Sequence, residues 1–207
     1  MATDRRRGRS FHEVVHDDRT LAVLGPLFKQ MNRQMLLLWR LGFGRMAEAW
    51  PAGMGRILVL EHLGRSSGRR YLTPLDFTRD GGSLYCVAAF GASADWYRNV
   101  VAAGTASVFL PNGCFDVHVV DVSSSDRRIG LIRSVLKDSG FATYLAGIDP
   151  RKMSDDELAG ATSSYQLIRF DPIAASGERL DDLKWVWGPV VVSLLLSAWW
   201  LGRERRN

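Results

Sequence analysis

Between residues 57 and 170 the chain consists of short apolar runs separated by turn-forming residues. Six of these runs have the length and the β-branched and aromatic content of strands. They are Ile57–Leu63, Tyr71–Thr78, Leu84–Ala89, Thr105–Leu110, Cys114–Val122 and Ser163–Phe170. Two of the connections, Asp80-Gly81-Gly82 and Pro111-Asn112-Gly113, have the composition of tight hairpin turns. The pattern predicts a small antiparallel barrel and disfavours a doubly wound parallel sheet, which needs a helix after each strand.

Few segments of this region have helical character. Asp95–Ala103 and Ser125–Lys137 interrupt the strands, and we expect the serines that precede Asp126 to cap the second helix. Residues 149–160 are polar and acidic, which is typical of a surface loop or a short helix. The predicted fold class is therefore α+β and mainly β.

The first third of the chain carries most of the positive charge. Residues 1–70 contain 13 Lys and Arg against 6 Asp and Glu, and the rest contains 14 against 16. Such a segment favours an anionic partner. Within it, apolar residues of segment 26–41 recur at helical spacing, with Lys29, Arg33 and Arg40 on the opposite face. This amphipathic helix is expected to pack on the main domain, with a membrane interface as the alternative.

The C-terminal segment has the pattern of a membrane anchor. Residues 185–202 contain no charge and have tryptophans at both ends, with arginines beyond. As a helix they would reach roughly 27 Å, just short of a hydrocarbon core of about 30 Å. A span, a helix lying in one leaflet and a packed helix therefore all remain open.

The sequence thus predicts four parts. They are a basic tail (1–20), a barrel domain with its N-terminal helix (21–172), a linker (173–184) and a hydrophobic anchor helix (185–202). No apolar run of signal-peptide length follows the Arg-rich start. We therefore expect the domain at the cytoplasmic face of the cell membrane, with lipid as a partner.

Two catalytic motifs occur without the context that their chemistry needs. His12-Glu13-Val14-Val15-His16 has the spacing of zinc proteases but lies in a charged terminus, so no metal is expected. Gly64–Gly68 has the G-x-S-x-G pattern, but strand formers follow where a nucleophile elbow requires a helix. Cys86 and Cys114 are isolated, which disfavours a disulfide framework and fits a reducing, cytosolic compartment.

The loop at residues 64–70 concentrates groups that bind anions. It offers the guanidinium groups of Arg65, Arg69 and Arg70 together with two serine hydroxyls and flexible backbone. Phosphate is the natural ligand for such a set. Composition alone supports an ordinary basic surface hairpin equally well.

This loop is the first of several motifs in a fixed order. They are G-R-S-S-G at 64–68, T-P-L at 73–75, D-G at 80–81, V-A-A-F-G at 87–91 and D-W-Y-R-N at 95–99. In order and spacing the series resembles the deazaflavin (F420)-dependent nitroreductase family, clearly over residues 55–125. The resemblance implies a split β-barrel of about six antiparallel strands that binds reduced coenzyme F420. It also implies hydride transfer to a lipophilic acceptor such as a quinone or a nitro compound.

The resemblance also implies a set of site residues. Those expected at the coenzyme are Arg65, Ser66, Ser67 and Arg69 at its phosphate, Pro74 and Leu75 at the ring, and Phe90, Gly91, Trp96 and Asn99 on the opposite wall. Tyr144 is the candidate proton donor. Two positions depart from the family pattern, because Ser66 replaces a lysine and Tyr71 replaces an arginine. Arg69 and Arg70 are the residues that can supply the missing charge.

Three other functions remain open. The same fold is compatible with a flavin mononucleotide (FMN) enzyme resembling pyridoxamine-phosphate oxidases, or with a non-catalytic module that binds a coenzyme or tetrapyrrole at the membrane. Nucleic-acid binding is disfavoured, because the basic helix lacks exposed aromatic residues for base stacking. Nicotinamide cofactors are not expected, since no strand opens a G-x-G-x-x-G turn. A homodimer is possible, as split barrels commonly dimerise.

Overall fold

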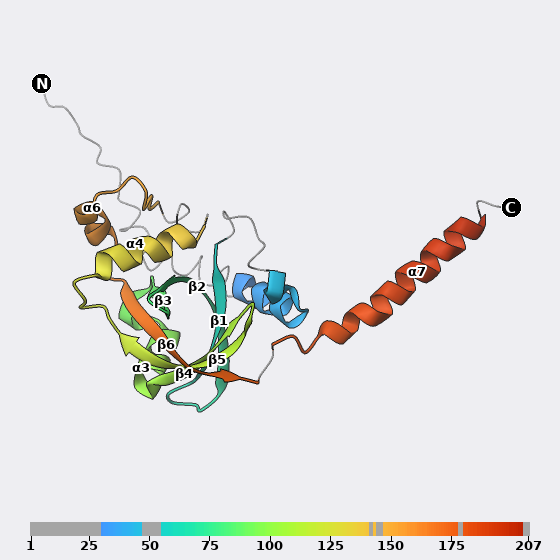
Figure 1. The fold of residues 1–207 in the computed structure, drawn as a ribbon, viewed down its shortest axis with the longest axis horizontal. Coiled ribbons are helices and arrows are strands. Elements are labelled where there is room, and N and C mark those ends of the chain that lie inside the picture. The colour runs from blue at the N-terminus through green and yellow to red at the C-terminus, as the bar shows by residue number, and fades with distance from the viewer. Residues whose placement is uncertain (1–29, 47–54, 141–142, 144–146, 178–179, 205–207) are drawn as a thin grey trace, which may run out of the picture.

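The computed structural model describes residues 30–46, 55–140, 143, 147–177 and 180–204. Six strands form a closed barrel in the order β1-β2-β3-β6-β5-β4, all pairs antiparallel (Figure 1). The strands are β1 (Ile57–Leu63), β2 (Arg70–Asp80), β3 (Ser83–Ala88), β4 (Thr105–Leu110), β5 (Gly113–Asp121) and β6 (Gln166–Ser176). The predicted antiparallel barrel is confirmed.

Alternate residues of the strands form the barrel core. Leu58 and Leu60 of β1 pack there with Val117 and Phe170, and all four are fully buried. Helix α3 (Asp95–Ala103) packs against β1, β4 and β5 and adds the buried Val100 to the same cluster. α3 therefore joins the barrel core directly.

A second apolar cluster holds two helices against the outer face of β3 and β6. Leu131, Ile132 and Val135 of α4 (Arg128–Asp138) pack there with Leu167 of β6. Helix α6 (Asp155–Ala161) contributes Leu158, and a capping box between Ser154 and Glu157 starts this helix.

The start of α4 differs from the prediction. It begins at Arg128 with no side-chain cap, so the expected serine cap is wrong. The Ser125 hydroxyl instead accepts a hydrogen bond from the Arg127 amide at 3.2 Å, within the turn that precedes the helix. The serines therefore shape that turn and leave the helix itself uncapped.

Residues 30–40 form the N-terminal helix, and residues 26–29 of the predicted helix lie outside the described residues. Trp39 of this helix is buried against Val59, Phe109 and Cys114 on the outer face of the barrel. The helix therefore packs on the domain, as expected, through a face that includes Trp39 and Met35. Met31 and Leu38, which the apolar pattern also includes, are exposed. A short 3-10 helix, η1 (Phe43–Met46), follows it.

The C-terminal part is fastened to this N-terminal helix. β6 continues to Ser176 in its ladder with β5, so residues 173–176 belong to the sheet and not to the expected linker. Arg40 donates to the Asp182 carboxylate at 2.9 and 2.6 Å. Beyond η4 (Lys184–Val186), the Trp187 indole donates to the Leu41 carbonyl at 3.0 Å.

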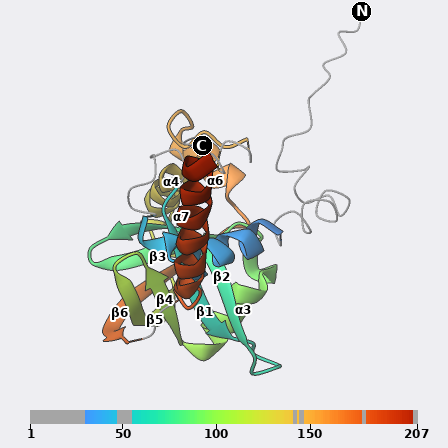
Figure 2. The same ribbon diagram turned by 90° about the vertical axis from the view of Figure 1, so that its right-hand side faces the viewer.

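Helix α7 (Trp187–Glu204) projects away from the barrel, and Figure 2 views the molecule from the side on which it emerges (Figures 1 and 2). Among the described residues, no helix combines the length and hydropathy needed to cross a membrane. The uncharged part of α7 spans about 24 Å, less than a hydrocarbon core of about 30 Å, because Arg203 and Glu204 occupy its last turn. The predicted membrane anchor at 185–202 and the location at the membrane face are therefore wrong, and the lipid partner has no support.

Candidate functional site

One end of the barrel brings most of the predicted site residues together. β1 ends there, β2 begins there and β3 ends there, and α3 starts beside them. The ladder between β2 and β3 comprises only the pairs from Phe77–Cys86 to Asp80–Ser83. The earlier half of β2 therefore pairs with β1 alone, and the barrel is split between this half and the end of β3.

The β1–β2 connection is a tightly closed loop with an exposed basic surface. The Gly64 amide donates to the Arg69 carbonyl and the Gly68 amide to the Gly64 carbonyl, both at 2.8 Å. Gly68 has a φ of +62°, which favours glycine. Arg65, Ser66 and Arg69 are exposed on this frame. The loop thus presents two guanidinium groups and a hydroxyl on a defined backbone.

Ser67 has a different role from its neighbours. Its hydroxyl accepts from the Arg69 amide at 3.3 Å and lies 3.5 Å from the Tyr71 hydroxyl. A side chain at Gly64 would place its Cβ 2.5 Å from the same Ser67 oxygen. The Ser67 hydroxyl therefore stabilises the loop conformation through contacts with other residues of the hairpin.

Asn99 of α3 fastens this loop to the barrel. Its side chain is buried, and its oxygen accepts from the Arg65 amide at 3.1 Å and from Arg65 Nη1 at 3.0 Å. The Asn99 amide nitrogen lies 3.2 Å from His62 Nδ1, and His62 Nε2 lies 3.1 Å from the Thr73 hydroxyl. Four residues from β1, the loop, β2 and α3 are thus linked by consecutive hydrogen bonds.

This network determines the state of the His62 ring. The Asn99 oxygen is occupied by two N–H donors, so its amide nitrogen donates to His62 Nδ1 and the ring proton is assigned to Nε2. Burial lowers the pKa of His62, opposed in part by the Leu63 backbone and by the carboxylates of Asp95 and Glu61. His62 is therefore neutral at neutral pH.

His62 is a member of this site that the sequence analysis did not predict. A signal was present, because a two-residue period that starts at Leu58 and Leu60 carries His62 onto the inner face of β1. Tyr71 and Thr73 follow the same period on β2, where Tyr71 lies opposite His62 in the ladder. Inward-facing polar residues at the end of two paired strands mark this end of the barrel.

The opposite wall lies between β3 and α3. Phe90 is 41% exposed, whereas Gly91 is buried with a φ of +64°. A Cβ at Gly91 would lie 2.6 Å from the Ser164 carbonyl oxygen, so only glycine fits there. Trp96 is half-buried and packs against the barrel core.

Tyr97, beside Trp96, is held in its protonated form. Its hydroxyl donates to the Asp121 carboxylate at 2.6 Å. Desolvation, together with this hydrogen bond and the charge of Asp121, raises the pKa of Tyr97 to about 12. Its hydroxyl therefore serves to attach α3 to β5.

Pro74 and Leu75, the two residues predicted at the ring, face opposite sides of β2. Leu75 faces the barrel core, while Pro74 lies opposite Val59 and so faces the outside with it. Successive residues of a strand point to opposite faces, so this pair cannot line one pocket from the same side. Tyr144, the candidate proton donor, lies outside the described residues.

The cations of the loop are not equivalent. Arg70 forms an ion pair with Glu61 of β1 at 2.5 Å. This ion pair lies where the loop joins the two strands. Arg65 is 37% exposed and also contacts Asp95 at 3.2 Å. For Arg69, no ion pair occurs within the part of the chain that the structure describes. Arg69 is therefore better placed than Arg70 to supply the charge that Ser66 lacks.

The structure is thus a six-stranded antiparallel barrel that is split at one end, beside an exposed basic loop. The chain belongs to the F420H(2)-dependent quinone reductase family, whose model matches residues 32–152. It is therefore an oxidoreductase that uses F420, and the predicted resemblance is confirmed. Membership of this family gives no support to the alternative of an FMN enzyme.

Solved structures with a similar fold have low sequence identity. A conserved hypothetical protein from Mycobacterium tuberculosis is 14% identical, with 63% of this chain and 81% of that chain covered and a TM-score of 0.46. An F420-H2 dependent reductase is 18% identical over 56% of this chain and 93% of that chain, with a TM-score of 0.37. HutZ, the heme storage protein from Vibrio cholerae, is 14% identical over 57% and 82%, with a TM-score of 0.40. No functionally curated protein matches the sequence.

Proposed function

We propose that the protein reduces a quinone with hydride from reduced F420, which it binds at the split end of the barrel. The observation that carries this proposal is the attachment of Arg65 to the buried Asn99. A surface hairpin that serves no ligand has no need of a buried amide to fix its backbone and its guanidinium. Here both are held, while the rest of the Arg65 side chain remains accessible.

The loop residues fit the anionic part of the coenzyme. F420 carries a phosphate and an oligoglutamate tail, both of which prefer guanidinium and hydroxyl donors. Arg65, Ser66 and Arg69 present such donors on the exposed surface of the loop. Ser67 contributes indirectly, because its hydroxyl sets the loop conformation.

The ring of the coenzyme is assigned to the split between β2 and the segment after β3. Leu75 and Trp96 supply apolar surface from the core side, and Phe90 supplies it from the exposed side. When bound, reduced F420 supplies the hydride. The protein aligns the two reactants and excludes water. Buried Gly91 permits the close approach of the Ser164 backbone behind this wall. Tyr144 stays the predicted proton donor.

A quinone is the proposed acceptor, and nitro compounds are the second class to test. The decisive experiment is a fluorescence titration of the purified chain with oxidised F420, beside an FMN control. Turnover of reduced F420 is then measured with a soluble quinone, with a nitroaromatic compound and without an acceptor. We expect saturable F420 binding and the highest kcat/KM with the quinone. Binding of FMN alone, or oxidation of a nicotinamide coenzyme in place of F420, would refute the proposal.

The oligomeric state is a separate prediction. Split barrels commonly dimerise, and a homodimer is therefore expected. Light scattering of the purified chain across a range of concentrations tests it, and a mass near 23.1 kDa at every concentration would refute it.

A further inference from the structure

We infer that His62 is a positioning residue for coenzyme binding, whose neutral ring fixes the amide of Asn99 and through it the conformation of Arg65. The inference rests on the proposed role of the loop at residues 64–70. The predicted site does not include His62, which lies at the end of β1 next to the loop and is 6% exposed. Its action is therefore indirect, through Asn99.

The first step is the direction of the Asn99 amide. Its oxygen receives two donors of Arg65, the backbone N–H and Nη1. If the Asn99 amide were flipped, its N–H groups would face both N–H donors of Arg65, and neither hydrogen bond could form. Only one orientation therefore holds the loop, and in that orientation Asn99 needs an acceptor on its other side.

The second step is the supply of that acceptor. His62 Nδ1 provides it at 3.2 Å, because Nε2 carries the ring proton toward Thr73 at 3.1 Å. Tyr71 stacks on the imidazole with 5.8 Å between ring centroids and 20° between planes. Stacking on one face and a hydrogen bond at each nitrogen leave the ring one orientation. Thr73 and Tyr71 thus fix the orientation of the His62 ring, and His62 fixes the orientation of the Asn99 amide. Asn99 in turn fixes the position of Arg65.

The third step is what protonation would do to this chain of contacts. An imidazolium ring donates from both nitrogens, so Nδ1 would oppose the Asn99 N–H group. The charged groups near His62 are Arg65 of the loop, Asp95 of α3 and Glu61 on its own strand. The Tyr71 ring of β2 stacks on the imidazole. Acidification should therefore turn the Asn99 amide and release Arg65 from it. The affinity for an anionic coenzyme should fall as His62 becomes charged.

Two substitutions at one position separate positioning from packing. His62→Asn keeps an acceptor oxygen on the Nδ1 side and does not titrate, whereas His62→Leu keeps an apolar bulk and removes the acceptor. We expect His62→Leu to weaken F420 binding 10-fold or more and His62→Asn to stay within threefold of the wild type. Because burial lowers the pKa of His62, the wild-type affinity should decline as the pH falls below about 6.5, while that of His62→Asn should stay flat. His118→Asn, on an exposed position of β5, is the matched control and should retain the decline.

Amide hydrogen exchange of Arg65, measured without coenzyme, tests the inference apart from the proposed function. His62→Leu should accelerate this exchange at least 10-fold, and His62→Asn should leave it within threefold. Faster Arg65 exchange with unchanged F420 affinity would support the positioning role and refute the loop as the coenzyme site. Unchanged exchange in His62→Leu, or equal loss in both variants, would overturn the inference. If His62→Leu does not fold, the comparison of the wild type with His62→Asn across pH decides: equal acid declines would overturn it.

Discussion

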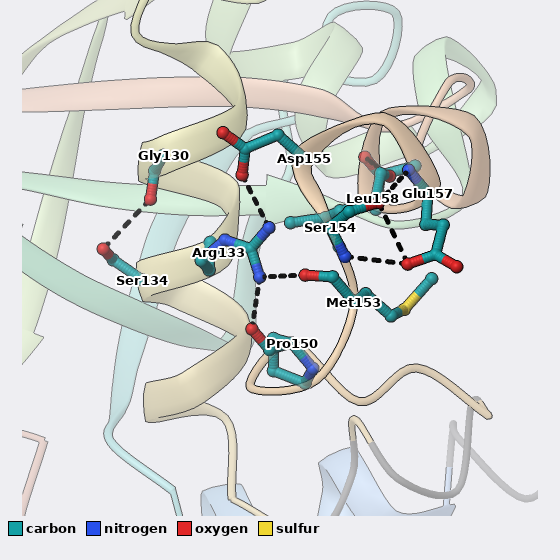
Figure 3. Close-up of polar contacts among 10 residues, drawn as sticks. Gly130, Arg133, Ser134, Pro150, Met153, Ser154, Asp155, Glu157 and Leu158 are labelled. Carbon is teal, nitrogen blue, oxygen red and sulfur yellow. Dashed lines mark hydrogen bonds and ion pairs between the residues drawn. The ribbon is translucent and has the colours of Figure 1, made fainter.

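Arg133 and Arg65 each lie at the centre of a polar network, but the two networks leave different amounts of the guanidinium accessible. Arg133 of α4 donates to the carbonyls of Pro150 and Met153 and to Asp155, and its side chain is only 18% exposed (Figure 3). Arg65 uses Nη1 for Asn99 and Asp95, and its side chain is 37% exposed. A guanidinium surrounded by acceptors of its own protein stabilises the fold, whereas a partly engaged one remains available to a ligand.

The largest effect on stability is expected at Arg133. Arg133→Ala leaves two carbonyl acceptors beside α4 without their donor, and each such loss costs about 1–3 kcal/mol. We predict a loss of about 2–4 kcal/mol in the free energy of unfolding, measured by urea denaturation. Arg127→Ala is the control, because the Arg127–Asp80 pair is mostly exposed. Equal losses of unfolding free energy in the two variants would mean that Arg133 stabilises the fold no more than an exposed arginine does.

Arg65→Ala is expected to have the opposite profile. Removal of a charge-assisted contact should weaken F420 binding by about 1.5–3 kcal/mol, or roughly 10- to 150-fold. Its effect on the free energy of unfolding should stay below about 1 kcal/mol, since the side chain is partly exposed. Fluorescence titration and urea denaturation of the same samples measure both quantities. An affinity within twofold of the wild type would exclude Arg65 from the phosphate site.

The sequence predicted the strands and their hairpin turns well, but it did not predict the contacts between residues far apart in the chain. β1, β4 and α3 begin and end at the predicted residues, because apolar runs bounded by turn or capping residues depend on local preferences. The His62–Asn99 contact joins residues 37 positions apart, and it depends on where α3 packs against the barrel. No local pattern encodes that placement.

Prediction and structure also differ in the orientation of two residues of β2 and in the bounds of the C-terminal helix. Pro74 and Leu75 were predicted together at the ring, but adjacent strand residues face opposite sides, so only Leu75 faces the barrel core. The membrane-anchor prediction was wrong because the uncharged run at residues 185–202 and the helix of the structure do not coincide. α7 begins two residues later and includes Arg203 and Glu204.

Asp76 allows a third test, because burial raises its pKa, whereas burial lowers the pKa of His62. Burial raises the pKa of Asp76 to about 7, opposed by a hydrogen bond with Ser139. The unfolded chain therefore loses this proton near pH 4 and the folded chain only near pH 7, so stability falls as pH rises between these values. Asp76→Asn should remove the decline and, because Asp76 keeps some exposure, should raise stability by about 1–3 kcal/mol at pH 8.

Urea denaturation of both proteins at pH 4.5 and pH 8 measures this effect. We expect the two stabilities to differ least at pH 4.5, where Asp76 is protonated in the folded protein. His62, with its lowered pKa, contributes the opposite slope, since the folded state resists its protonation as pH falls. A larger gain for Asp76→Asn at pH 4.5 than at pH 8 would contradict the assignment.

The smallest expected effect concerns Asp95, which competes with the coenzyme for Arg65. The Asp95 side chain is 81% exposed and lies 3.2 Å from Arg65, so the pair is worth about 0.2–1 kcal/mol. Asp95→Asn should release Arg65 toward the phosphate and tighten F420 binding by about 1.4- to 5-fold. The gain should shrink with added salt, because the charges involved are exposed.

Asp156→Asn is the matched control for net charge, because Asp156 is an exposed carboxylate in the first turn of α6. Its affinity for F420 should equal that of the wild type within about 1.4-fold. Equal tightening in both variants would indicate a general charge effect. Weaker binding in Asp95→Asn alone would mean that Asp95 orients Arg65 for the coenzyme, so that Asn99 is insufficient to hold it.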